Sequence, residues 1–498
     1  MDAATGLDSL FAFDNTYARL PDAFFARLAP PPAAAPQLVI VNEQLAQQLG
    51  LDPRLLASPG GIGVLSGKVL PYGAEPLAMV YAGHQFGHFV PQLGDGRAIL
   101  LGEVIGRDGL RRDVQLKGCG PTPFSRRGDG RAALGPVLRE YIISEAMAAL
   151  GIPTTRSLAA VLTGEEVLRE MPLPGAILTR VASSHIRVGT FQFFAARGDV
   201  DGVRRLADYV IARHYPEVGR AANRYRAMLD CVIERQARLI AQWMLLGFIH
   251  GVMNTDNMAI SGETIDYGPC AFMDTYEPAT VFSSIDRMGR YAYNNQPSIA
   301  HWNLARLAET LIPLLGSDKE EGLIEARAAI DAYPSKYEAA YLAGVRRKLG
   351  LLQERPDDLA LAQDLLDRMA ANKADFTLTF RQLCDAAVSV EVDAEVRRLF
   401  DAPAAFDGWA VKWRHRLASE GGNAVERRTS MRAVNPAYIP RNHRVEEAIT
   451  AAVDEGRTSI FETLVQVTTA PFDDQPGSER YAEPPQSHQI VHQTFCGT

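Results

Sequence analysis

The sequence has few cysteines and no long apolar run, and both absences narrow the class of protein. Its cysteines, Cys119, Cys231, Cys270, Cys384 and Cys496, are scattered without the paired spacing of a zinc site or a disulfide framework. No run of about 18 apolar residues is present, so we expect no membrane-spanning helix. The N-terminal segment is acidic and lacks the pattern of a secretory or transit signal. We therefore expect a cytoplasmic protein without disulfides.

The chain also lacks an excess of basic residues and any internal repeat. It has 498 residues, a formal net charge of −8 and 47% hydrophobic residues. A net negative charge argues against binding to nucleic acid, which requires a basic surface. The hydrophobic content is sufficient for a large core divided over two or more lobes. The oligomeric state is open, with a monomer as the default expectation.

The most informative stretch lies near the middle of the chain. Met258-Ala259-Ile260 and Thr264-Ile265 have the character of short strands, and Ser261-Gly262-Glu263 that of the turn between them. We expect a hairpin that brings Asn257 and Asp266 side by side at its open end. An amide oxygen and a carboxylate suit Mg²⁺, which prefers hard oxygen ligands and keeps several waters.

This layout is similar to the catalytic loop and the Asp-Phe-Gly loop of protein kinases, in which an Asn and an Asp hold the metal ions. Asp256 precedes the amide residue by one position, so its carboxylate can face the group that reacts with a metal-bound phosphate. A kinase has its catalytic Asp two residues after the His of the loop, and here that position is Val252. The chain is therefore not an ordinary protein kinase. The alternative is that both loops merely cap turns, in which Asp, Asn and Gly are common.

Two upstream segments carry the residue types that hold phosphates. Gly94-Asp95-Gly96-Arg97 is a tight turn before an apolar strand; its glycines let backbone N–H groups approach a phosphate, and its arginine adds a charged fork. Residues 113–118 alternate like a strand with Lys117 near its end, and a helix that begins near Gly135-Pro136 directs Glu140 toward this lysine. Each feature alone also fits a hairpin or a surface charge. Their order along the chain is that of kinases.

Further arginines add to this positive charge. The loop 121–131 contains three arginines, and Arg180 and Arg187 lie on either side of a Ser-Ser-His segment. Such loops bind phosphate through backbone donors and guanidinium groups. If all of them face one pocket, that pocket holds more positive charge than a simple kinase needs. This excess favours a triphosphate tail that is buried in the pocket.

The rest of the chain is predominantly helical. Residues 228–247 have the clearest helical spacing of apolar side chains and run directly into the His loop. Residues 302–352 and 356–402 continue the helical periodicity. Residues 470–487 are rich in Pro, Asp, Glu and Ser, so we expect a mobile linker there.

Together the motifs resemble those of the selenoprotein O family, the YdiU-type proteins. The motifs are Leu93-Gly94-Asp95-Gly96-Arg97, Leu116-Lys117-Gly118, Asn254-Thr255-Asp256-Asn257-Met258, Asp266-Tyr267-Gly268-Pro269 and the near-terminal Cys496. The resemblance spans essentially the whole chain and implies an α+β, protein-kinase-like bilobal fold. It implies a mixed, β-rich N-lobe at residues 1–188, a helical C-lobe with the catalytic and metal loops at 189–430, and a C-terminal extension at 431–498.

The resemblance also implies an activity. The family, first taken for pseudokinases, is one of protein adenylyltransferases: AMP passes from ATP to Ser, Thr or Tyr hydroxyls of proteins, pyrophosphate is released, and Mg²⁺ or Mn²⁺ is required. ATP binds flipped relative to kinases, in agreement with the excess of arginines. Some members carry selenocysteine near the C-terminus; Cys496 matches that position, so a redox role would be that of a thiol. The alternatives are a phosphotransferase that uses the γ-phosphate, and a non-catalytic nucleotide-binding scaffold.

The family's functional residues can be carried over position by position. The resemblance implies that Asp256 is the proton acceptor, that Asn257 is a metal ligand, and that Asp266 contacts both metal and nucleotide. Glu140 would orient Lys117. The implied nucleotide contacts are Gly94, Gly96, Arg97, Lys117, Asp129, Gly130, Arg180, Arg187 and Asp266.

Overall fold

The computed structural model describes residues 10–495. Its N-terminal part is built on an eight-stranded antiparallel sheet in the order β1-β3-β6-β7-β10-β9-β2, with β8 beside β10. The strands are β1 (Phe25–Arg27), β2 (Gln37–Val41), β3 (Leu77–Met79), β6 (Ala98–Ile105), β7 (Arg111–Lys117), β8 (Ala132–Ala133), β9 (Arg156–Leu168) and β10 (Pro172–Ala182). A separate hairpin is formed by β4 (Gly83–Gln85) and β5 (His88–Val90), and β11 (Phe248–Ile249) pairs with β12 (Ala271–Phe272).

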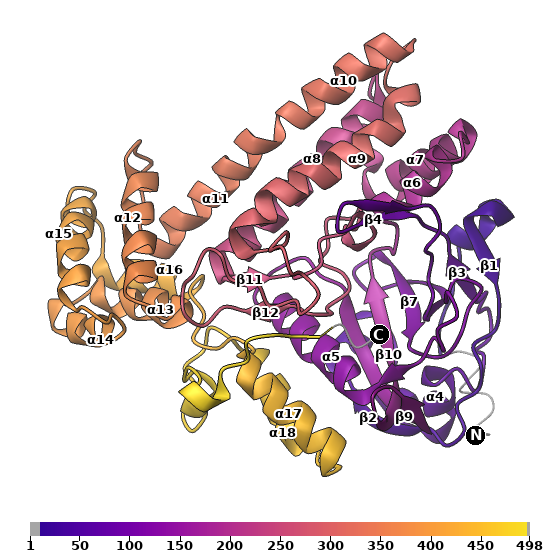
Figure 1. The fold of residues 1–498 in the computed structure, drawn as a ribbon, viewed down its shortest axis with the longest axis horizontal. Coiled ribbons are helices and arrows are strands. Elements are labelled where there is room, and N and C mark those ends of the chain that lie inside the picture. Colours follow the sequence, from indigo (N-terminus) through magenta and orange to yellow (C-terminus); the bar gives the residue numbers. More distant parts are fainter. Residues whose placement is uncertain (1–9, 496–498) are drawn as a thin grey trace.

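Helices cover both faces of the sheet, and further helices make up the C-terminal part (Figure 1). Those close to the sheet are α2 (Glu43–Gln48), α3 (Pro53–Leu56), α4 (Pro59–Leu65), α5 (Leu134–Ala149), α6 (Val188–Ala195) and α7 (Val200–His214). The C-terminal helices are α8 (Arg224–Leu246), α9 (Gln296–Leu315), α10 (Lys319–Asp331), α11 (Tyr333–Leu349), α12 (Asp358–Ala371), α13 (Phe376–Ala386), α14 (Asp393–Arg397), α15 (Ala404–Ala418), α16 (Ala424–Arg432), α17 (Asn442–Asp454) and α18 (Ser459–Thr468). This confirms the predicted α+β fold with a sheet-rich N-terminal region and a helical C-terminal region.

The alternation of side chains along the strands sorts the sheet into two faces. Val114 and Leu116 of β7 pack with the apolar residues of α2, α3 and α4. The residues between them, Gln115 and Lys117, therefore point to the opposite face, toward α5. On β10, Arg180 lies opposite Gln115 in the antiparallel register. The predicted strand thus delivers its lysine to the same face as an arginine from the neighbouring strand.

Helix α8 leads the chain into the loop that follows it. Its buried residues recur at helical spacing, and Gly247 ends the helix in the left-handed conformation with φ 72°. The chain then passes through β11 to His250, which is fully buried. The His250 side chain donates from Nε2 to the carbonyl of Ile265 over 2.9 Å. One imidazole thereby ties the His loop to the segment before Asp266.

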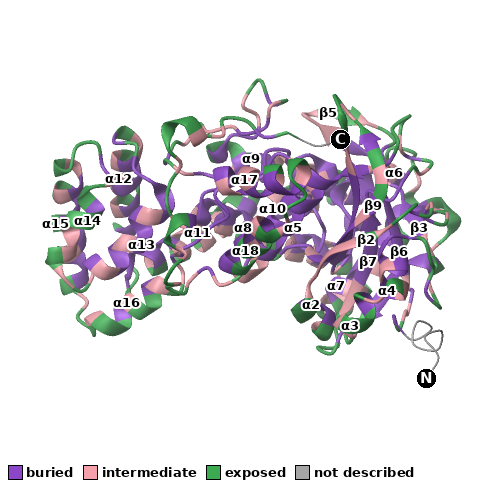
Figure 2. Cartoon of the chain, turned by 90° about the horizontal axis from the view of Figure 1, so that it is seen from below, coloured by how far each residue is buried: buried purple, intermediate pink, exposed green. Residues whose placement is uncertain are grey.

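The last helices return to the N-terminal body. Helices α17 and α18 pack against α5 (Figure 1), where the rings of Tyr141 and Phe461 lie 5.6 Å apart. Helices α12 to α16 instead extend away from the sheet, and Figure 2 shows exposed residues on their outer surfaces. In the part of the chain that the structure describes, none of the helices combines the length and apolar character needed to traverse a bilayer.

Two local predictions are wrong. The arms of the predicted hairpin at residues 258–265 do not pair with each other: Ala259 bridges to Arg187, and Thr264 bridges to Thr154. Two arms of two or three residues form too few hydrogen bonds to be stable as an isolated hairpin. Each arm therefore pairs with a different, earlier segment of the chain. Residues 470–487 are not a free linker, because Asp474 pairs with Arg381 over 2.7 Å and other residues of the segment pack on the helices.

Candidate active site

A cavity of about 290 Å³ lies between the sheet and the loops 250–268. It brings together most of the residues that the sequence singled out. Those that line it are Gly96, Arg97, Lys117, Arg180, Arg187, Asp256, Asn257 and Asp266. They come from the turn before β6, from β7, from β10, from the loop before α6 and from the two motif loops, so the cavity depends on the whole fold.

Lys117 forms the centre of an ion-pair cluster. Its Nζ lies 2.6 Å from Oε2 of Glu140 and 2.8 Å from Oδ1 of Asp266. Glu140 also lies 3.4 Å from Nη1 of Arg180 through its other oxygen. The predicted strand lysine and helix glutamate therefore meet, and Asp266 joins them.

Asp266 pairs with three cations at once. Besides Lys117, Arg180 approaches its Oδ1 to 2.5 Å and Arg187 its Oδ2 to 2.7 Å. Burial disfavours the charged carboxylate, but the charges of Lys117, Arg187 and Arg180 outweigh it and hold the pKa of Asp266 well below its ordinary value. The residue has φ 63°, a left-handed conformation that is uncommon outside glycine. Such strained backbone is typical of functional sites.

Arg187 connects this cluster to a second carboxylate. Its guanidinium lies over the ring of Tyr81, with Cζ 4.5 Å from the centroid, and 3.8 Å from Asp95. Asp95 is buried and accepts hydrogen bonds of 3.1 Å from the backbone N–H of Met79 and the amide of Gln115. Burial raises the pKa of Asp95. We did not expect Asp95 in the site, although it stands inside the Gly-Asp-Gly-Arg motif.

Asp256 has a different environment from Asp266. Its Oδ2 accepts a hydrogen bond of 3.2 Å from the Gln85 amide, whereas its buried Oδ1 has no hydrogen-bond partner among residues 10–495. Burial raises the pKa of Asp256 to about 6, against the opposing charge of Arg187. A Cβ at Gly83 would lie 2.5 Å from Oδ1, so the hairpin β4–β5 can cover the carboxylate only with glycine there. A buried carboxylate with one unsatisfied oxygen suits a proton acceptor.

Asn257 and Asp266 have the donor atoms that a hard divalent cation takes. The Asn257 amide nitrogen donates to the carbonyl of Val252 over 2.9 Å, so its oxygen remains as the atom with ligand character. The described residues contain no group of three or more His, Cys, Asp or Glu side chains arranged for a metal. An amide and one carboxylate instead fit Mg²⁺ or Mn²⁺ that takes its other ligands from water and phosphate.

The glycine turn is shaped by its neighbour. Gly94 has φ 87°, and a Cβ there would lie 2.5 Å from the Phe124 ring; a Cβ at Gly96 would lie 2.9 Å from the Phe124 carbonyl oxygen. The absence of side chains at these two glycines therefore allows the loop 121–131 to pack directly against the turn. Within that loop, Asp129 pairs with Arg169 over 2.8 Å, and neither Asp129 nor Gly130 lines the cavity. Gly94 does not line the cavity either, so three of the predicted contacts, Gly94, Asp129 and Gly130, do not join the others in this structure.

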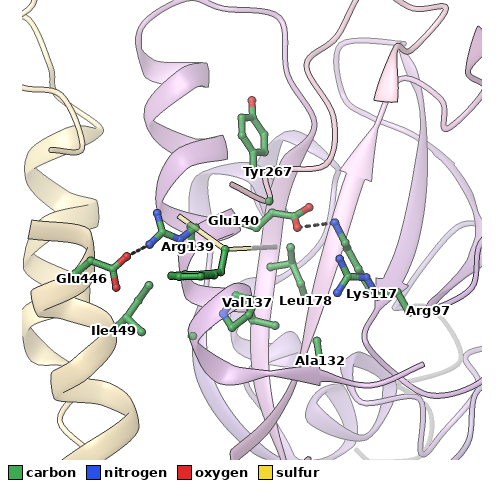
Figure 3. A pocket seen from close by; sticks show the side chains of 14 residues that line it. Arg97, Lys117, Ala132, Val137, Arg139, Glu140, Leu178, Tyr267, Glu446 and Ile449 are labelled. Atoms are coloured by element: carbon green, nitrogen blue, oxygen red, sulfur yellow. Dashed lines mark hydrogen bonds and ion pairs between the residues drawn. The ribbon is translucent and has the colours of Figure 1, made fainter. Parts of the chain in front are cut away.

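A second pocket of about 180 Å³ adjoins the first and shares Arg97, Lys117 and Gly268 with it. Figure 3 shows the Lys117–Glu140 pair at one side and the Arg139–Glu446 pair at the other. Its other lining side chains are largely apolar and include Ala132, Val137, Leu178, Tyr267, Ile449 and Phe495. Sequence reasoning missed this pocket, because α17 contributes one wall from more than 300 residues away in the chain.

The last predicted residue is Cys496, which lies outside the described residues. The preceding segment docks beside the loop that follows Asp266: Oγ1 of Thr494 donates to the carbonyl of Pro269 over 2.7 Å, and Thr494 bridges to Ser283. Cys270, next to Pro269, is buried.

The comparison with known proteins identifies the family of the chain. Residues 9–469 match the family model described as "Protein adenylyltransferase SelO". The chain is 65% identical over 488 residues to a protein nucleotidyltransferase YdiU of Bradyrhizobium diazoefficiens, covering 98% of this chain and 99% of the relative. It is 64% identical over 498 residues to a protein of that name from Methylorubrum extorquens, covering 99% of this chain and 100% of the relative. The chain therefore belongs to the SelO family and is a nucleotidyltransferase.

Proposed function

We propose that the protein transfers AMP from ATP to Ser, Thr or Tyr hydroxyls of other proteins and releases pyrophosphate. The observation that carries this proposal is the cluster of Lys117, Arg180 and Arg187 around one carboxylate at the buried end of the cavity. Buried cations are costly unless they are paired, and a polyphosphate is the anion whose charge matches several of them. The β- and γ-phosphates of ATP then lie inward.

Asp266 acts as a stand-in for these phosphates before ATP binds. Its two oxygens neutralise the three cations. With phosphates paired to the cations, Asp266 and Asn257 would be the residues that hold Mg²⁺ or Mn²⁺. A metal held there offsets the negative charge of the phosphates. Nucleotide and metal should therefore bind cooperatively.

The adenosine end of ATP fits the second pocket. Its walls are largely apolar, and it adjoins the charged cavity through Arg97 and Lys117. A purine needs apolar contact area, whereas a triphosphate needs cations. With the phosphates in the first cavity and the base in the second, the α-phosphate lies between them.

Asp256 is the residue that accepts the proton. The hydroxyl oxygen of the substrate attacks the α-phosphorus, the bond from this phosphorus to the bridging oxygen breaks, and the hydroxyl proton passes to Asp256. A pKa of about 6 leaves the carboxylate ionised at neutral pH and closer in basicity to its task than an ordinary aspartate. Positioning and electrostatic stabilisation contribute the rest of the rate.

Two alternatives predict other products. A phosphotransferase would expose the γ-phosphate to the acceptor, but inward β- and γ-phosphates shield it. A scaffold would bind nucleotide without transfer, but it has no need of an unsatisfied buried carboxylate at Asp256. Redox control through the Cys496 thiol is compatible with the proposal and is not required by it.

Parallel labelling with α-³²P-ATP and γ-³²P-ATP tests the proposal. The full chain is incubated with Mg²⁺ or Mn²⁺, alone and with a cytosolic lysate, and the Asp256→Asn variant is the control. Label from the α-phosphate only, lost in the variant, supports adenylyl transfer. Label from the γ-phosphate only overturns it in favour of a kinase. No label from either, while ATP still raises the melting temperature, overturns it in favour of the scaffold.

A further inference from the structure

Beside the cavity, the protein surface carries a cluster of cations on an aromatic ring. The guanidinium carbon of Arg290 lies 4.9 Å from the Trp302 ring centroid, and that of Arg306 lies 5.1 Å from it. All three side chains are partly exposed. We call Arg290, Trp302 and Arg306 the arginine rim. It belongs neither to the cation cluster around Asp266 nor to the lining of either pocket.

The arginine rim is next to the proposed proton acceptor. Its Arg290 guanidinium lies against Gly87, where a Cβ would be 3.5 Å from Cζ. Gly87 is in the turn of the hairpin whose Gln85 donates to Asp256. On the other side, Tyr291, the neighbour of Arg290, donates its hydroxyl to Oδ1 of Asn254 over 2.6 Å. The rim is therefore fixed to both segments that hold Asp256.

Arg290 lacks an acidic partner. Among the described residues no carboxylate forms an ion pair with Arg290, and its buried Nε has no hydrogen-bond partner. Arg306, on the same ring, pairs with Glu309 over 2.6 Å. Arg306 is thus already neutralised, and Arg290 is the guanidinium of the rim that an added carboxylate could pair with.

The charge of this surface contrasts with the chain as a whole. The protein has a net charge of −8, whereas the Arg290 guanidinium beside the site has no ion-pair partner among the described residues; the nearby Asp286 carboxylate accepts from the Arg290 backbone N–H. Two exposed apolar side chains lie shortly before Arg290 in the sequence. Ile285 is 56% exposed and lines the cavity, and Met288 is 92% exposed. An apolar and cationic surface suits a peptide segment with an acidic side chain better than a second nucleotide phosphate.

We propose that the arginine rim binds an acidic residue of the protein substrate and so selects hydroxyls that lie in acidic segments. The guanidinium of Arg290 presents a planar fork that matches a carboxylate, and its stacking on Trp302 holds the fork in place. This inference rests on the proposed function, because it takes the acceptor of the AMP group to be a protein.

Peptide binding tests the inference without any transfer step. Two fluorescein-labelled peptides with one central Ser are compared by anisotropy on the full chain, one flanked by Asp and Glu and the other by Asn and Gln. We expect the acidic peptide to bind about tenfold more tightly, and Arg290→Ala to remove the difference. Arg205→Ala, at an exposed arginine of α7, is the matched control and should preserve it. Equal affinity of the two peptides for the unmodified protein overturns the inference.

Two further measurements separate this inference from the proposed function. Arg290→Lys retains the charge without the planar fork, and we expect it to keep a reduced preference; far-UV circular dichroism and the ATP-induced rise in melting temperature check that the variants are folded. A positional peptide library is then labelled with α-³²P-ATP. Transfer without acidic preference overturns the inference and leaves the function intact. The opposite result is also possible: the acidic peptide binds in an Arg290-dependent way, but no substrate takes up the α-phosphate label. This result overturns the proposed function and leaves the arginine rim as a binding surface for acidic peptides.

Discussion

The protein buries two lysines in regions of opposite chemistry. Lys117, 7% exposed, lies at the end of β7 between the carboxylates of Glu140 and Asp266. Lys348, 4% exposed, lies in α11 and has no carboxylate partner among the described residues. Its Nζ instead stands 4.2 Å from the centroid of the Phe380 ring. Burial lowers the pKa of Lys348 to about 7.

The difference shows what it takes to keep charge inside a protein. A buried ammonium without a counter-ion sheds its proton readily, because the aromatic face compensates only part of the lost hydration. The cations around Asp266 are instead neutralised by its carboxylate, which in the proposed function gives way to phosphate. The site is thus a cluster of buried cations that are paired with carboxylates. Lys348, in contrast, packs between helices without a carboxylate partner among the described residues.

The largest effect should come from removing the carboxylate that holds the cluster. Asp266→Ala leaves Lys117, Arg180 and Arg187 without their shared partner and removes a proposed metal ligand. We expect α-phosphate transfer to fall about a thousandfold, and the nucleotide-free protein to melt at a lower temperature because buried charges lose compensation. Transfer assays and thermal unfolding with and without ATP check both effects. A loss of only a few-fold would refute the metal assignment.

A smaller effect on turnover should separate Asp256 from Asp266. Asp256→Asn preserves the shape of the side chain but removes the proton acceptor, so transfer should fall about a hundredfold. Asp256 forms no ion pair in the described structure, so the affinity for ATP should stay near that of the unmodified protein. Calorimetric titration with ATP measures this affinity. Equal losses of binding and turnover would indicate a structural role.

The two lysines can be compared directly with the same substitution. Lys117→Met should weaken ATP binding about tenfold or more, because a phosphate partner is lost and the buried Glu140 keeps only its longer contact with Arg180. Lys348→Met should leave ATP binding unchanged, because Lys348 lines neither pocket of the site. The ATP-induced shift of the melting temperature reports both. A similar loss of the ATP-induced shift in both variants would mean that Lys117 and Lys348 do not differ in their contribution to ATP binding.

Much of the cluster could be predicted from local patterns. The alternation of β7 indicated a strand with its lysine at the end, and helical spacing directed Glu140 to the same side; both patterns act over a few residues. The local pattern showed Arg180 and Arg187 only as an excess of charge, and their assignment to the nucleotide came from the family resemblance. That Arg180 faces Gln115 depends on the register of two strands about 65 residues apart, which no local pattern specifies.

The errors have the same origin. Residues 258–265 read as a hairpin, but Ala259 and Thr264 pair with segments that precede them by more than 70 residues. The position of Asp129 depends in the same way on distant packing, because its carboxylate pairs with Arg169, 40 residues further along the chain. The second pocket depends on α17, which packs on α5 although about 300 residues separate them in the chain. Long-range packing, not local propensity, decides these positions.

The smallest predicted effect concerns stability and pH. Below pH 7, Lys348 is protonated in both the folded and the unfolded state, so the full cost of burying its charge is present. Between pH 7 and the unfolded pKa of 10.5, only the unfolded state keeps the proton. The free energy of unfolding therefore rises with pH in this range. Lys348→Met should therefore raise the free energy of unfolding by about 1–2 kcal/mol at pH 6, and this gain should shrink toward pH 9. Urea unfolding at several pH values measures it, and Arg205→Ala, at an exposed arginine, provides the control. A gain that does not change with pH would mean that Lys348 is not charged at pH 6, and would remove the contrast with Lys117.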